Sequence, residues 1–125
     1  MCVSTGPCNL EGALVSRKAD VLDHEEVLMG DLILVEVLQG IRDERTFRDV
    51  RQRLTQLEFR DLGGRQAANA AAENYRLLRS KGITIRKTIN MIIGTYCILH
   101  ALPLLHADKD FDALETYLGL TVYRG

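Results

Sequence analysis

The chain has 125 residues, of which 46% are hydrophobic and 26% are charged, and its formal net charge is -1. The length suits one ordinary domain with one core, and the composition excludes an intrinsically disordered chain. The nearly balanced charge excludes nucleic-acid binding through bulk positive charge, so any such contact must use a local basic patch.

The cysteine pattern and the absence of a targeting signal favour a cytoplasmic protein. The three cysteines are odd in number and show no paired spacing, which argues against a disulfide framework and against a zinc site. Residues 1–12 lack the pattern of a secretory signal. The apolar stretch 89–105 is too short and too interrupted, with Pro103 inside it, to predict a membrane span.

The first elements follow a divergent segment. Residues 1–20 show no clear period and form a divergent N-terminal part of a single domain over 1–125. Residues 31–40 predict a short helix that Asp31 caps and Gly40 ends, although the β-branched, apolar sequence leaves a strand open. A second helix is predicted from apolar residues at helical spacing, namely Phe47, Val50, Leu54 and Leu57.

The middle of the chain predicts a strand and a long helix. A short strand is expected over 58–62, before two glycines. An alanine-rich helix follows, which Gly82 ends at the position after its C-cap. The face of this helix that is expected to be buried comprises Ala68, Ala71, Ala72, Tyr75 and Leu78.

The last third predicts a buried helix between strands. Thr88 is the expected N-cap of a helix that is apolar on nearly all sides and therefore buried between layers. A short central strand at 103–105 and an edge strand over 118–123 follow. Short apolar strands that alternate with helices predict an α/β fold, with a parallel sheet covered by helices on both faces.

Glu36 is the first candidate functional residue. It is the one carboxylate in the run Leu32–Leu38, and burial of such a group requires a cation, a metal ion or a water-filled cleft. The alternative is an amphipathic helix that turns Glu36 to solvent.

Two further groups lie near the predicted late strand and the buried helix. Asp108 and Asp110 follow the strand, where ligands bind in open α/β sheets, and they are well placed to hold a hard cation such as Mg²⁺. Alternatively, Asp108 caps the next helix. Arg86 and Lys87 stand before the buried helix, where cations oppose the helix dipole. That placement favours contact with phosphate, or else an ordinary solvated loop.

Three strings in the chain resemble the VapC group of PIN domains, in the family's order and spacing. They are GDLILVEVLQG at 30–40, YRLLRSKGITIRKTIN at 75–90 and LPLLHADKDFD at 102–112. The resemblance covers residues 21–125. It implies a three-layer α/β/α fold with a short parallel sheet whose first strand is degenerate.

The resemblance also implies a site and its partners. Glu36, Asp108 and Asp110 match acidic residues of the family that bind Mg²⁺ or Mn²⁺, with Glu36 and Asp108 as catalytic residues. Asn90 stands where the family has an aspartate, as a neutral metal ligand. Arg86 and Lys87 match a basic pair that would bind RNA. The implied partners are an RNA substrate, a VapB-type antitoxin and a second copy in a homodimer, with no membrane.

The start of the chain departs from the family. The family's first strand ends in an aspartate, and Ser4 takes that position if Val3 and Thr5 are remnants of the strand. The expected function is a metal-dependent endoribonuclease of a toxin–antitoxin system, which hydrolyses RNA phosphodiester bonds. The alternatives are a PIN-like protein that binds antitoxin or RNA without cutting it, and a plain α/β interaction module.

Overall fold

Helices alternate with very short strands along the chain. The computed structural model describes residues 2–3 and 28–123. In chain order the elements are β1 Cys2–Val3, β2 Leu28–Gly30, α3 Asp31–Gln39, α4 Glu44–Leu54, β3 Glu58–Arg60, α5 Arg65–Ser80, α6 Thr88–Leu99, β4 Leu104–Leu105 and α7 Asp110–Leu118.

The described strands form one parallel sheet in the order β3-β2-β1-β4. Cys2 pairs with Leu28 on one side and with Leu104 on the other. The first strand, which the resemblance implied to be degenerate, is the two-residue β1, and it lies between β2 and β4. All these strands run the same way, so their carboxyl ends meet at one edge of the sheet.

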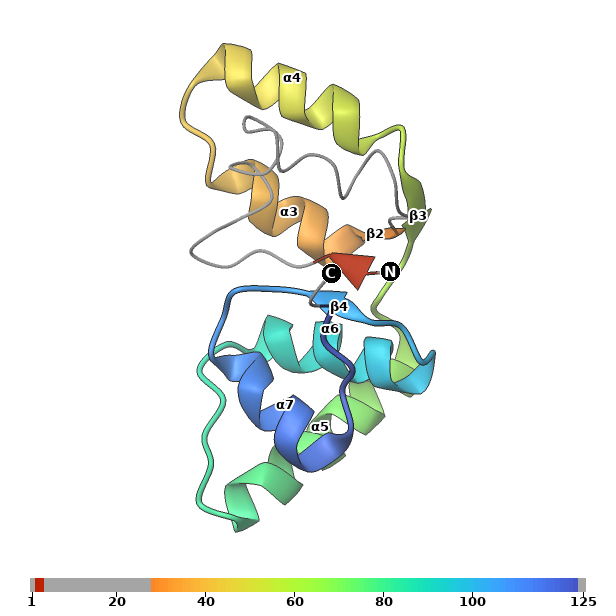
Figure 1. Ribbon diagram of the computed structural model, residues 1–125, viewed down its shortest axis with the longest axis vertical. Coiled ribbons are helices and arrows are strands. Elements are labelled where there is room, and N and C mark those ends of the chain that lie inside the picture. The colour runs from red at the N-terminus through yellow and green to blue at the C-terminus, as the bar shows by residue number, and fades with distance from the viewer. Residues whose placement is uncertain (1, 4–27, 124–125) are drawn as a thin grey trace.

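Helices cover both faces of the sheet (Figure 1). On one side α3 packs against β2, and α4 packs on α3. On the other side lie α5, α6 and α7, with α6 in contact with both of its neighbours. The three-layer α/β/α arrangement predicted from the sequence is confirmed.

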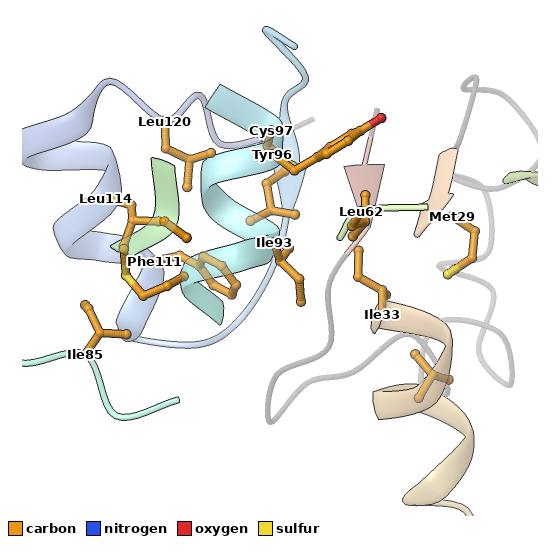
Figure 2. Packing of buried hydrophobic residues seen from close by; sticks show 14 of the residues in the cluster. Met29, Ile33, Leu62, Ile85, Ile93, Tyr96, Cys97, Phe111, Leu114 and Leu120 are labelled. Carbon is orange, nitrogen blue, oxygen red and sulfur yellow. The ribbon is translucent and has the colours of Figure 1, made fainter. Parts of the chain in front are cut away.

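Helix α6 lies at the centre of the hydrophobic core, as its apolar sequence predicted. Ile93 is fully buried and lies between the Phe111–Leu114 group of α7 and Ile33 of α3 (Figure 2). Gly94 allows a close approach here, since a Cβ at this position would collide with the side chain of Leu114. The core therefore runs without a break from α7 through α6 to the opposite layer.

Residues 31–39 form a helix rather than the alternative strand, but its cap differs from the prediction. Gly30 is the N-cap and Asp31 is the first helical residue. The Asp31 carboxylate accepts from the backbone N–H of Leu32 and of Leu62, both at 2.8 Å, and so ties α3 to the loop after β3. A Cβ at Gly30 would collide with the side chain of Leu62, which explains the glycine.

Helix α5 ends as predicted but turns a different alanine face inward. Gly82 has φ +82°, and the N–H of Ile83 donates to the carbonyl of Leu78, which is the Schellman arrangement. Ala67 and Ala71 are buried, whereas Ala68 and Ala72 are exposed. Ala71 and Leu78 belong to both the predicted and the observed buried face. The prediction chose Ala68 where Ala67 is the buried residue.

Two expectations in the last third are also corrected. Lys87, not Thr88, is the N-cap of α6, and no side chain caps the helix there. Helix α7 continues to Leu118, and the expected strand over 118–123 is reduced to a parallel bridge between Val122 and Leu104. None of the helices in the described ranges is both long and apolar enough to cross a membrane.

Candidate functional site

Three polar side chains meet beyond the carboxyl end of β4. Asp108 and Asp110 follow that strand, and Asn90 lies in the first turn of α6. Because α6 leads into β4, its first turn lies at the same edge of the sheet as the residues that follow β4. Hydrogen bonds from Asn90 to each of the two acids hold this group together.

Asn90 lies at the centre of this group and is only 1% exposed. Its Nδ2 donates to Oδ2 of Asp108 and to Oδ2 of Asp110, both at 3.1 Å. Carboxylate oxygens only accept hydrogen bonds, so the amide must present its nitrogen, not its oxygen, to both acids.

Asp110 is also buried, with 7% exposure. Besides Asn90, it accepts from the backbone N–H of Arg86 at 3.2 Å and from that of Lys87 at 3.1 Å. Three N–H donors thus offset the cost of removing this carboxylate from water. Asp110 joins the start of α7 to the loop before α6, and it satisfies backbone groups that no side-chain cap reaches.

Asp108 is more exposed than Asp110, and the ammonium group of Lys87 lies beside it. Its Oδ1 accepts from the backbone N–H of Asp110 at 3.0 Å. The alternative that Asp108 caps α7 is wrong, because the N-cap is Lys109 and no side chain caps this helix. Oδ2 of Asp108 lies 3.7 Å from Nζ of Lys87, whose side chain is 57% exposed. Arg86 is exposed as well. The basic pair therefore lies at the rim of the acidic group.

Comparisons with known proteins find relatives in sequence. No protein-family model matches the sequence. Over 94 residues the chain is 28% identical to "VapC ribonuclease Mb1587" of Mycobacterium bovis and to "Ribonuclease VapC11" of Mycobacterium tuberculosis strain H37Rv. These matches cover 75% of this chain and 70% of each relative.

Solved structures share the fold at lower sequence identity. A chain of VapBC2 from Rickettsia felis, bound to a DNA fragment from the promoter, superposes with a TM-score of 0.72 at 16% identity, covering 98% of each chain. A chain of DNA-bound VapBC from Salmonella typhimurium gives 0.72 at 15% identity, covering 98% of this chain and 97% of that one. The chain is therefore similar in sequence to VapC ribonucleases and shares its fold with chains of VapBC structures.

Glu36 was also expected in this site. Glu36 is half-buried in α3. Within residues 2–3 and 28–123, no three acidic, histidine or cysteine side chains are gathered so that they could hold a metal ion. The role of Glu36 as a ligand stays a prediction, which the contact between α3 and α6 permits. Ser4 lies outside the described residues.

His106 contributes to the site but was missed as a candidate. Its Nδ1 accepts from the backbone N–H of Asp108 at 3.2 Å, and its ring lies 4.8 Å from that of Phe111, centroid to centroid. His106 therefore helps to fix the turn that presents Asp108. Its place two residues before that acid was the available signal.

The side chains in this group are of the chemical types that bind a hard cation. Carboxylate oxygens and an amide oxygen are donors that Mg²⁺ and Mn²⁺ accept. The number of ligands is too small, however, because the hydrogen bonds of the described residues bring together two carboxylates. The amide of Asn90 turns its nitrogen, not its oxygen, toward both of them. Asp108 is the better placed ligand of the two acids, because Asp110 already accepts from two backbone groups.

Proposed function

We propose that this chain is a metal-dependent endoribonuclease of the VapC toxin type, which hydrolyses RNA phosphodiester bonds. The observation that carries the proposal is the meeting of Asn90, Asp108 and Asp110 at the carboxyl edge of the sheet, beside exposed Arg86 and Lys87. The named ribonucleases among the relatives support the same activity.

The proposed roles follow from charge and exposure. Asp108 and Glu36 would be the catalytic carboxylates, and with Asn90 and Asp110 they would hold Mg²⁺ or Mn²⁺. When bound, the ion would supply an activated water and stabilise negative charge on the phosphate oxygens.

The basic pair would hold the RNA backbone at the rim of the site. The exposed side chains of Arg86 and Lys87 would bind phosphates next to the acids. The backbone N–H groups of both residues are fixed by Asp110. A bound phosphate would therefore meet cations whose place relative to Asp108 is set by the fold.

The first test is cleavage of RNA by the wild-type chain and by Glu36→Gln. We expect cleavage in Mn²⁺ or Mg²⁺ that a chelator abolishes, and a loss of roughly 10²-fold or more in Glu36→Gln, because the neutral amide cannot act as a base or as an anionic ligand. Gel analysis of a labelled RNA measures the rate.

Asp112→Asn is the matched control. Asp112 lies on the exposed side of α7, so its loss of charge should leave cleavage unchanged. Absence of cleavage by the wild-type chain at any metal concentration would contradict the proposed activity. Full activity of Glu36→Gln would instead remove Glu36 from the site.

The same proposal includes partners and a cellular location. The solved structures that share the fold are described as VapBC assemblies, which supports a VapB-type antitoxin as partner of this chain. We also propose a homodimer and a cytoplasmic location, where RNA substrates occur. Sedimentation of the purified chain would measure the first, and a monomer at micromolar concentration would contradict it.

A further inference from the structure

The amide group of Asn90 satisfies both acids of the site with its two hydrogens. Nδ2 has two N–H donors, and it has two carboxylate acceptors at 3.1 Å. Asn90 is 1% exposed, so water cannot easily replace these bonds. Two carboxylates that accept from one nitrogen lie close together, and their mutual repulsion requires a positive group between them.

The remaining contacts of the two acids come from the protein as well. Asp110 accepts from the N–H groups of Arg86 and Lys87, and Asp108 has the Lys87 ammonium 3.7 Å away. Asn90, the two backbone N–H groups and the Lys87 ammonium together offset the negative charge of the two carboxylates, which a bound cation would otherwise offset.

We propose that Asn90 is a positioning residue that holds Asp108 and Asp110 together without a metal ion. In this role it fastens the first turn of α6 to the loop between β4 and α7. The inference goes beyond the proposed function, because these hydrogen bonds hold whether or not the chain cuts RNA. Only its metal-dependent part rests on that function.

An aspartate at position 90 would make this group of side chains depend on a bound cation. Its carboxylate has no hydrogen to donate, so three acids would face one another in a buried place. The fold near α6 would then need a cation to be stable. With asparagine, a cation must compete with the amide, so metal binding should add little stability to the wild-type chain.

The test is thermal unfolding of the full chain in a chelator and in Mn²⁺. We expect the wild-type midpoint to be nearly the same in both. Asn90→Asp should melt lower in the chelator, on the order of 5 °C or more. Mn²⁺ should restore this loss as its concentration rises. Folding of Asn90→Asp in Mn²⁺ alone would support the proposal in the same way.

Two further variants separate the hydrogen bonds from the charge. Asn90→Ala should melt lower in both solutions and gain nothing from Mn²⁺. Asn74→Asp is the matched control, because Asn74 donates to Oγ1 of Thr95 at 3.1 Å and not to either acid. Its midpoint should show no dependence on Mn²⁺.

The outcomes separate this inference from the proposed function. Equal midpoints of the wild type and Asn90→Asp in the chelator would overturn it. So would an Mn²⁺ gain in the wild type as large as that in Asn90→Asp. A loss in Asn90→Asp and in Asn90→Ala without Mn²⁺ rescue, together with no RNA cleavage, would support the fastening role and reject the proposed metal-dependent activity.

Discussion

Asp43 shows how one side chain fixes the start of a helix. It is the N-cap of α4, and its Oδ2 accepts from the backbone N–H of Thr46 at 2.9 Å and from the Thr46 hydroxyl at 2.8 Å. These hydrogen bonds, the backbone one first, lower the pKa of Asp43 below its ordinary value of 3.8. The charged form of Asp43 is therefore favoured in the folded chain.

The lowered pKa predicts the direction of an acid effect. The stability that the charged cap contributes is present above pH 3.8 and is lost as pH falls through the lower pKa of the folded state. Asp43→Asn keeps a capping oxygen without a titrating group. Urea unfolding should therefore show the wild type losing stability relative to Asp43→Asn below about pH 4. Parallel pH profiles would contradict this.

The meeting of Asn90, Asp108 and Asp110 could be predicted, because acids after a parallel strand and the first turn of the preceding helix share one edge of the sheet. The resemblance implied that Asn90 offers a neutral oxygen to a metal ion. In the structure its nitrogen faces both acids, because carboxylate oxygens only accept hydrogen bonds. The role of His106 depends on a turn geometry that the sequence does not specify.

Helices α6 and α7 approach closely at one glycine. A Cβ at Gly94 would collide with the side chain of Leu114, which is fully buried and would have to shift. Gly94→Ala should therefore lower the free energy of unfolding by about 1–3 kcal/mol.

Urea unfolding can check this against Gly40→Ala. Gly40 has φ -80°, and an added Cβ there would come no closer than 3.8 Å to a backbone oxygen. Gly40→Ala should be neutral or slightly stabilising. Equal stability of Gly94→Ala and the wild type would show that α7 can move away from α6 at little cost.

Element types were predicted more reliably than element ends. Residues 31–39 became a helix because Ile33 and Val37, one turn apart, are both buried against the core. The caps at Asp31 and Thr88 were wrong by one residue. Contacts with residues far along the chain decide these ends, since Asp31 binds the N–H of Leu62 and Asp110 binds the groups before α6.

At the scale of the whole molecule, protection from solvent is concentrated in α6. This helix is buried along most of its length and contacts α3, α5 and α7. By contrast, α4 lies on the outside of α3 and is mostly exposed (Figure 1). We therefore expect α4 to unfold locally more easily than α6.

Hydrogen exchange should follow this difference. Amides in α6 should exchange only by global unfolding, whereas those in α4 should exchange through local opening at least 10-fold faster. Mass spectrometry of peptides from the two helices measures the rates. Slower exchange in α4 would show that the core is organised around the other layer.

The pairing of β1 with both β2 and β4 sets the order in which the chain can mature. On the ribosome, Cys2 is made long before Leu104, its partner in the sheet. Such distant pairing closes a large loop before it gains contacts, which slows folding. The edge that carries Asp108 is therefore completed only when the last strand docks beside the first. The residues of β1 must therefore wait for β4 to be made before this part of the sheet can close.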